Sequence, residues 1–306
     1  MKEICMLLVA VILWGTAIAP TKWALESIQP FTLLFIRLFF AGGICLLFSF
    51  KQLKKSVAHK QVPWKRMNLL SFTGVAGYFM FTSYGISLTS GLHVSIIDAA
   101  LPLVTILFSA FFLKEKIQLN YWVGIVLGAA GVLLITIPSS NVDQEVSLIG
   151  DTLILLSTFL FAFYTVLLKK PKQEQYLSKK VFTTLTLIIG AVILLPFATV
   201  ETFYYGFPKV ETWKVGLSII YLVIGATILA YWFWNRALES VSASVSGLYL
   251  NALPLISIVA SIVLLDEALT GKIVIGGSLV LIGVGWADKQ KISKLLKKDN
   301  LNSKEC

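Results

Sequence analysis

Ten apolar stretches follow one another along this chain, and most are long enough to cross a lipid bilayer as a helix. A crossing helix needs about 20 mostly apolar residues. The stretches lie at residues 4–25, 31–50, 67–88, 92–113, 121–138, 148–168, 179–200, 213–235, 242–265 and 271–288. They lack the alternation of lipid-facing and lumen-facing residues that marks the strands of a membrane β-barrel. The sequence therefore predicts an all-α membrane protein with ten transmembrane helices.

The composition indicates lipid as the main solvent of the chain. Hydrophobic residues make up 57% of it and charged residues 14%, whereas a soluble domain carries about a quarter charged residues. The net charge of +10 comes from basic residues between the apolar stretches and in the tail. Nucleic-acid binding requires such residues to gather on a soluble face, so no nucleic-acid partner is expected. The basic tail, residues 289–306, is expected to rest against anionic lipid or to be solvated.

The distribution of basic residues predicts the orientation of the helices. If the N-terminus is cytoplasmic, most of the 26 lysines and arginines fall in cytoplasmic segments, as the positive-inside rule requires. The pattern therefore predicts a multi-pass protein of the cell (cytoplasmic) membrane with both its N- and C-termini in the cytoplasm.

An internal repeat divides the ten stretches into two sets of five. An offset of 152 residues places Leu101–Leu103 on Leu253–Leu255 and Glu115 on Glu267. Five is an odd number, so the second set enters the membrane upside down. Inverted repeats place a substrate site near the membrane midplane and allow alternating access to it. The sequence therefore predicts two inverted five-helix repeats around a central cavity. The two repeats are residues 4–138 and 148–288.

Prolines lie inside several of these stretches, among them Pro20, Pro102 and Pro254. A proline removes one backbone hydrogen bond from a helix and permits a kink. Kinked helices often flank the substrate site of a transporter, so these prolines are candidates for gating. The alternative is that they are tolerated without such a role.

Several short motifs resemble a known family. They are the Trp14-Gly15 pair, the Phe35–Leu38 segment and two copies of Leu-Pro-Leu followed by Leu-x-Glu. Together they resemble the EamA-type branch of the drug/metabolite transporter superfamily over residues 4–288. This resemblance implies ten helices, a central cavity and secondary transport, often efflux, of amino acids or other small metabolites.

Three charged residues inside the predicted helices are the leading site candidates, because charges in a membrane are costly and usually functional. Arg37 suits a substrate carboxylate or phosphate, or it pairs with Asp98 or helix-end carbonyls, or extends its side chain to the interface. Asp98 is a candidate to bind a substrate amine or to carry a coupling proton, with an ion pair to Lys22 or Arg37 as the alternative. Lys22 is either an interfacial anchor or a substrate contact.

Other polar and aromatic residues are weaker candidates for the cavity lining. Successive helical residues point about 100° apart, so only some of them reach one cavity. Glu115 and Glu267 are instead expected to cap helix ends beside basic neighbours, and Gly124 with Gly128 to allow close helix packing. The candidates for the cavity lining are Trp14, Tyr78, Tyr84, Trp232, Asn235, Tyr249 and Asn251.

No enzyme motif stands out in the sequence. There is no Gly-x-Ser-x-Gly elbow, no His-rich cluster and no paired acidic metal motif, so a membrane-embedded lipid-modifying enzyme is disfavoured. The cysteines and histidines are isolated along the chain, so neither a metal nor another cofactor is expected. No P-loop motif is present, so an ion gradient or substrate exchange is expected to drive transport.

These features predict a secondary active transporter, an exporter of a small polar metabolite such as an amino acid, driven by protons or exchange. The alternative on the same fold is a flippase for lipid-linked polar groups. The expected partners are a small-molecule substrate and membrane lipids, and the protein is expected to be a monomer or a homodimer.

Overall fold

The computed structural model describes residues 2–59, 61–114, 119–137, 147–169, 177–237 and 249–302, without the side chains of Lys2, Lys169, Asn235 and residues 288–302. Every regular element in these ranges is a helix. The first-half helices are α1 (Lys2–Gly15), α2 (Ile18–Leu25), α3 (Pro30–Ala58), α4 (Trp64–Ser71), η1 (Phe72–Ala76), α5 (Gly77–Leu88), α6 (Gly91–Ala99), α7 (Leu101–Leu113) and α8 (Leu119–Thr136). The second-half helices are α9 (Leu148–Lys169), α10 (Lys179–Tyr205), α11 (Trp213–Ile220), η3 (Tyr221–Leu229), α12 (Ala230–Ala237), α14 (Leu253–Leu265) and α15 (Gly271–Asn302).

Most of these helices are long and apolar enough to cross a membrane. Within the described ranges, eight helical stretches meet that requirement, and some of them join two consecutive helices. The apolar helices Leu253–Leu265 and Gly271–Ala287 are shorter. Many of their large apolar side chains, such as Phe111 and Phe203, are exposed on the outside of the bundle, where lipid would cover them. The predicted class, an all-helical multi-pass membrane protein, is confirmed.

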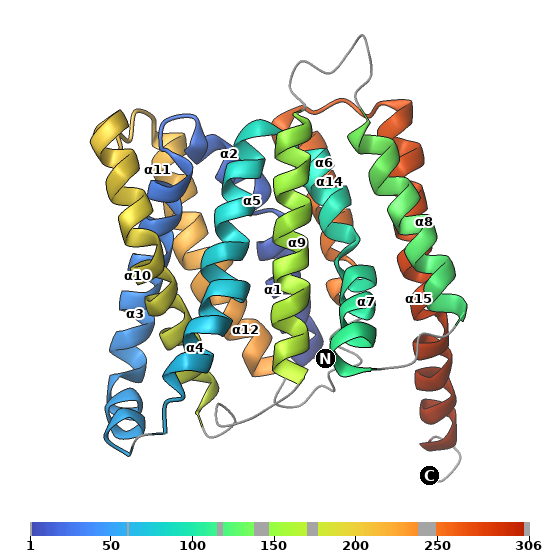
Figure 1. Ribbon diagram of the computed structural model, residues 1–306, viewed down its shortest axis with the longest axis horizontal. Coiled ribbons are helices and arrows are strands. Elements are labelled where there is room, and N and C mark those ends of the chain that lie inside the picture. Colours follow the sequence, from blue (N-terminus) through green and yellow to red (C-terminus); the bar gives the residue numbers. More distant parts are fainter. Residues whose placement is uncertain are drawn as a thin grey trace.

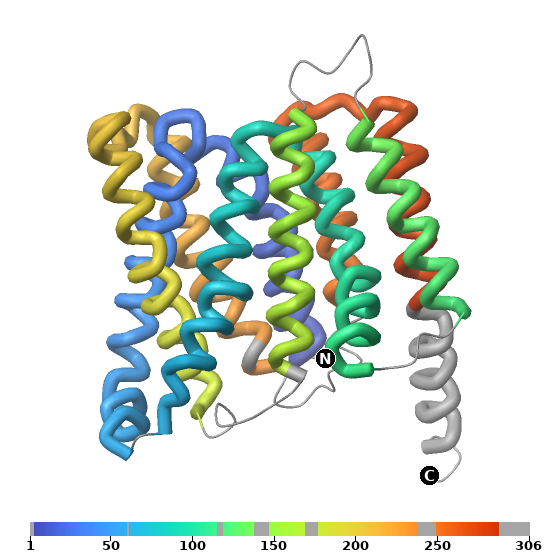
Figure 2. Tube along the Cα trace, viewed as in Figure 1, coloured from blue at the N-terminus to red at the C-terminus, as the bar shows by residue number. Residues whose placement is uncertain are grey.

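The helices run side by side in one bundle (Figures 1 and 2). The helix α1 begins at the end toward which α15 runs, at the bottom of Figure 1. We call the opposite end, where α6 begins and the connection from α14 to α15 lies, the distal end. The helices α10 and α3 pack together, as do α5 and α9 and also α8 and α15.

Three of the expected proline sites lie at helix breaks. Pro20 is the third residue of α2, Pro102 the second of α7 and Pro254 the second of α14. A proline is tolerated in the first turn of a helix but has no N–H for the carbonyl four residues earlier. The predicted interruptions are therefore present, and a gating role for them stays a prediction.

Two segments related by the 152-residue offset have the same local conformation. Ala100 (φ −76°, ψ −8°) precedes α7, and Ala252 (φ −80°, ψ −16°) precedes α14. Each helix has 13 residues and ends at a left-handed residue, Lys114 (φ 57°) or Asp266 (φ 55°). In Figure 1 the two helices run toward opposite ends of the bundle.

The helices α8 and α15 pack closely through glycines in a reciprocal contact. A Cβ atom added at Gly124 would lie 2.5 Å from the carbonyl oxygen of Gly283, and one added at Gly131 would lie 2.5 Å from that of Gly276. The offset relates Gly124 to Gly276 and Gly131 to Gly283. Gly124 therefore contacts the counterpart of Gly131, and Gly131 contacts the counterpart of Gly124. Such a contact requires antiparallel helices, and it confirms the close packing predicted at Gly124.

Candidate functional site

Arg37 lies eight residues into α3, between the buried residues Leu34 and Leu38. It is only 9% exposed. Its Nε donates a hydrogen bond to Thr227 Oγ1 at 2.8 Å, and its Cζ lies 4.6 Å from the centre of the Phe79 ring, in cation–π geometry. Within the described residues, its two terminal Nη groups have no hydrogen-bond or ion-pair partner. The guanidinium is therefore held on one edge and available on the other.

The two residues that hold Arg37 both belong to spans that contain a π-helix. Thr227 lies within η3 and donates its own hydroxyl hydrogen to the carbonyl of Leu222, five residues earlier, at 2.8 Å. Phe79 follows η1 at the start of α5. A π-helix misaligns successive turns and is frequent at functional sites. Arg37 thus contacts one such span from each half of the chain.

Three tyrosines lie near Arg37. The charge of Arg37 interacts with the phenol groups of Tyr231, Tyr78 and Tyr221, which come from three different helices. Trp14 packs edge-on against Tyr231, with 5.3 Å between ring centres, and donates its indole N–H to the carbonyl of Ala226 at 3.0 Å. Aromatic side chains from both halves of the chain are therefore the neighbours of Arg37.

Asp98 lies near the end of α6, just before the break at Ala100. Thr158 of α9 donates a hydrogen bond to its Oδ1 at 3.1 Å, and the residue is partly exposed. Tyr78 interacts electrostatically with both Asp98 and Arg37. The structure therefore brings three of the predicted site residues into one neighbourhood.

Asp98 forms no ion pair with Lys22 or Arg37 in the described part of the chain. Arg37 and Asp98 are bound to the hydroxyls of Thr227 and Thr158 and not to each other. Lys22 instead pairs with Glu267, with Nζ 3.2 Å from Oε1. The interpretation of Asp98 as the partner of Lys22 or Arg37 is therefore wrong.

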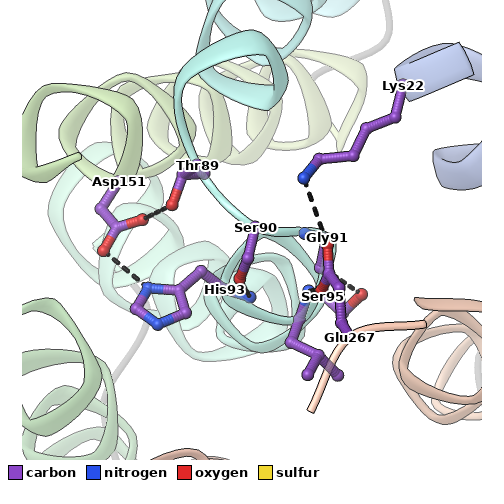
Figure 3. Close-up of polar contacts among 9 residues, drawn as sticks. Lys22, Thr89, Ser90, Gly91, His93, Ser95, Asp151 and Glu267 are labelled. Carbon is purple, nitrogen blue, oxygen red and sulfur yellow. Dashed lines mark hydrogen bonds and ion pairs between the residues drawn. The ribbon is translucent and has the colours of Figure 1, made fainter. Parts of the chain in front are cut away.

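Glu267 caps the N-terminus of α6 at the distal end (Figure 3). Its two carboxylate oxygens accept hydrogen bonds from the backbone N–H groups of Gly91 at 2.6 Å and Leu92 at 2.7 Å. The first N–H groups of a helix have no partner within the helix, and a carboxylate also complements the helix dipole. The predicted role of Glu267 at a helix end is confirmed, whereas Glu115 lies outside the described residues.

A second buried polar group at the distal end was not predicted. His93 Nδ1 lies 2.8 Å from Asp151 Oδ2, and Thr89 donates to Asp151 Oδ1 at 2.6 Å (Figure 3). Both His93 and Asp151 are buried. Because an ionised carboxylate only accepts hydrogen bonds, Nδ1 of His93 acts as the donor. The histidine is isolated in sequence, and its partner follows 58 residues later.

Another unpredicted cap fixes the start of α3. The carboxylate of Glu201, in α10, accepts hydrogen bonds from the backbone N–H groups of Phe31 and Thr32 at 3.2 and 2.8 Å. It also accepts the hydroxyl hydrogen of Thr32 at 3.0 Å. The helix that carries Arg37 is therefore anchored at its distal end by the second half of the chain.

The remaining candidates lie apart from this neighbourhood or at its edge. Tyr84 is 42% exposed and stacks on Phe31, and Trp232 is 53% exposed. Tyr249 and Asn251 are half-buried beside the break before α14. The side chain of Asn235 lies outside the described residues. In the described ranges, no three metal-ligating side chains gather in a group that fits a metal ion.

Comparison with known proteins gives consistent results. A family model described as "EamA-like transporter family" matches residues 1–137 and 148–287. A protein of Archaeoglobus fulgidus named "Uncharacterized transporter" is 30% identical over 291 residues, which cover 93% of this chain and 98% of the relative. A protein of Escherichia coli named "Probable amino-acid metabolite efflux pump" is 26% identical over 298 residues, covering 92% of this chain and 93% of the relative.

A solved crystal structure shares the fold. The likeness has a TM-score of 0.64 and covers 95% of this chain and 98% of the other. The two sequences are 18% identical, so this likeness concerns the arrangement of the helices alone.

Proposed function

Because the chain belongs to the EamA-like transporter family, we propose that it is a secondary active transporter of a small polar metabolite such as an amino acid. The matched relatives are named as transporters, and the proposal assigns the chain no enzymatic activity. Its cargo and mechanism are inferred from the central residues.

Arg37 carries this proposal. A charge inside a membrane helix is costly unless a partner compensates it. The structure gives Arg37 a partner for Nε but, among the described residues, none for its Nη groups. Two adjacent Nη groups match the two oxygens of a carboxylate, and this bidentate geometry is both strong and specific. We therefore assign the carboxylate of the cargo to Arg37.

Asp98 supplies a charge of the opposite sign, and Tyr78 interacts electrostatically with both Asp98 and Arg37. Its Oδ1 is occupied by Thr158, and Asp98 is partly exposed. An amino acid carries both a carboxylate and an ammonium group, so it is complementary to Arg37 and Asp98 together. The surrounding aromatic rings would contact its less polar part. In the absence of an ammonium group, Asp98 would carry the coupling proton.

Two inverted repeats would give this site alternating access. The matched conformations at α7 and α14 and the reciprocal glycines of α8 and α15 support ten crossing helices in two inverted sets. The recurrence of a π-helix in η1 and η3 supports the same division. Arg37 is held by both halves, so its surroundings change when one half moves relative to the other.

Two further observations support a direction of transport and an orientation in the membrane. A relative that covers most of the chain is named as an efflux pump, which supports export from the cytoplasm. The basic residues support a cell-membrane location with both termini in the cytoplasm, so that the distal end is the outer end. A monomer or a homodimer is compatible with a site built within one chain.

The test begins with the purified protein in detergent, screened for thermal stabilisation by amino acids, amines, nucleosides and sugar phosphates. A cargo that binds the folded state raises the melting temperature by linkage. The stabilising compounds are then followed into vesicles under an imposed proton gradient and in exchange mode. We expect an amino acid or a related carboxylate to be both bound and transported.

Variants of Arg37 connect this result to the site. Arg37→Gln should weaken cargo binding roughly 10- to 100-fold, the range for a lost hydrogen bond to a charged group. Arg37→Lys keeps the charge but not the two adjacent Nη groups, and it should recover only part of the affinity for the cargo. Full transport by Arg37→Gln would contradict the assignment. Vesicles that move a lipid-linked reporter but no soluble compound would favour the flippase alternative.

A further inference from the structure

The helices α2 and α6 are the distal halves of two interrupted spans. The first break lies between α1 and α2 at Thr16 and Ala17, and the second lies between α6 and α7 at Ala100. Pro20 and Pro102 remove the N–H groups that would bond to the carbonyls of Thr16 and Asp98. Because these hydrogen bonds are already missing, each half-helix can tilt at its break without breaking them.

Both breaks adjoin the central site. The hydroxyl of Thr16 lies 2.5 Å from that of Tyr221, which interacts with the charge of Arg37. Asp98 lies two residues before Ala100. The half-helices α2 and α6 extend from these breaks toward the distal end (Figure 1). They therefore lie between the central residues and the distal surface.

One carboxylate joins these two half-helices at that surface. Glu267 caps α6 through the N–H groups of Gly91 and Leu92, and its Oε1 also lies 3.2 Å from Nζ of Lys22 in α2 (Figure 3). Glu267 itself belongs to the connection between α14 and α15, in the second half of the chain. A single side chain thus links α2, α6 and the opposite half.

We propose that Lys22 and Glu267 form a latch that holds α2 and α6 closed over the distal side of the central site, and that this side opens when the ion pair separates. The latch would control opening on one side in the alternating access proposed above, and it rests on that proposal. The cap on α6 does not depend on Lys22, so the latch can open while α6 keeps its N-terminal hydrogen bonds.

The exposure of the pair suits a contact that opens repeatedly. The side chains of Lys22 and Glu267 are 22% and 9% exposed, so water can solvate the ammonium group as it leaves. Pairs that are partly solvated contribute little to stability. Loss of such a pair shifts a closed–open equilibrium by roughly two- to fivefold, which is enough to measure without unfolding the protein.

The test measures access to the centre and requires no knowledge of the cargo. A reporter, Thr16→Cys, is placed in a background in which the native cysteines are replaced, namely Cys5→Ala, Cys45→Ala and Cys306→Ala. The protein is inserted into vesicles, and a charged, membrane-impermeant methanethiosulfonate is added from the distal side. The rate of modification of the reporter reports how often that side is open.

We expect Lys22→Gln to raise this rate roughly two- to fivefold and Lys22→Arg to leave it near the parent value. Glu267→Gln removes the same pair and one acceptor of the α6 cap, so it should raise the rate at least as much. The double variant should not exceed Glu267→Gln by much, since the pair is already lost in that variant. Lys209→Gln is the matched control, because Lys209 is an exposed lysine beyond α10, and it should leave the rate unchanged.

An unchanged rate in Lys22→Gln overturns the latch, and so does an equal rise in Lys209→Gln. If the glutamine variants do not fold, the modification rate is measured in the parent protein at low and high salt, because salt screens a partly exposed ion pair. High salt should then raise the modification rate of the reporter more than it raises the rate at which the reagent reacts with a free thiol, glutathione. The absence of such a rise again overturns the latch. If Lys22→Gln leaves the modification rate unchanged while the parent protein transports its cargo, the latch has failed and the proposed function has not.

Discussion

Thr227 accepts a hydrogen bond from Arg37 across 190 residues of sequence, and it passes its own hydroxyl hydrogen to the carbonyl of Leu222. The hydroxyl therefore fixes one edge of the guanidinium relative to the π-helix η3. This arrangement leaves the opposite edge for the carboxylate that we assign to Arg37. Thr227 is thus a positioning residue, and it acts through Arg37.

Replacing Thr227 by valine tests this positioning. Thr227→Val preserves the shape of the side chain but removes the acceptor for Nε of Arg37 and the donor to Leu222. We expect cargo binding to weaken by about 1.5–3 kcal/mol, the range for a hydrogen bond to a charged group. Thr227→Ser keeps the hydroxyl and should restore most of the affinity. Equal binding by the valine and serine variants, measured by titration calorimetry, would show that the hydroxyl does not position Arg37.

Asp98 is expected to couple transport to protons. Asp98→Asn cannot release or take up a proton, so proton-driven accumulation in vesicles should be lost. Exchange of cargo across the membrane needs no proton and should be retained, with a lower affinity for a cargo whose ammonium group faces Asp98. Asp98→Glu keeps a carboxyl group and should retain part of the accumulation. Thr158→Val, which removes the hydrogen bond to Asp98, should leave coupling in place. Full proton-driven transport by Asp98→Asn would refute this role.

The glycine contact between α8 and α15 should be sensitive to a single methyl group. A Cβ at Gly283 would lie 2.6 Å from the carbonyl oxygen of Gly124, whereas one at Gly285, on the same helix, meets nothing within 4 Å. We expect Gly283→Ala to destabilise the protein by about 1–3 kcal/mol through overpacking. Gly285→Ala should be neutral or slightly stabilising. Thermal unfolding in one detergent compares the two, and equal melting temperatures would contradict the close contact.

The buried pair of His93 and Asp151 is expected to contribute to stability. Asp151→Ala leaves the Nδ1–H of His93 and the hydroxyl of Thr89 without their acceptor, at a cost of about 1–3 kcal/mol for each buried group. Asp151→Asn keeps one acceptor oxygen and should lose less. Both variants are compared by thermal unfolding. A melting temperature of Asp151→Ala equal to that of the parent protein would show that other groups satisfy the two donors.

The sequence was sufficient to predict the membrane helices because a bilayer imposes a length and an apolar composition on every span. It also predicted the helix-end role of Glu267 and the close packing at Gly124, since both depend on local motifs that recur along the chain. The breaks at Pro20, Pro102 and Pro254 follow from the missing N–H of proline.

The contacts within the central site could not be predicted in the same way. Thr227 resembles many other threonines, and its selection as the partner of Arg37 depends on the π-helix register of η3. That register is set by packing between helices and leaves no short motif in the sequence. His93 and Asp151 present the same difficulty, because neither residue has a polar neighbour in sequence that indicates the other. The exposure of Trp232 likewise depends on which face of α12 meets α1.

The cap on α6 has a consequence for the synthesis of the protein. Glu267 follows Gly91 by 176 residues, so the ribosome completes α6 long before its carboxylate exists. Throughout that interval the N–H groups of Gly91 and Leu92 must be satisfied by water or lipid headgroups, which keeps the start of α6 near the membrane surface. Glu201 stands in the same relation to α3, 170 residues after Phe31. Two helices of the first half therefore reach their final hydrogen bonding only after part of the second half, for α3, or most of it, for α6, has been made.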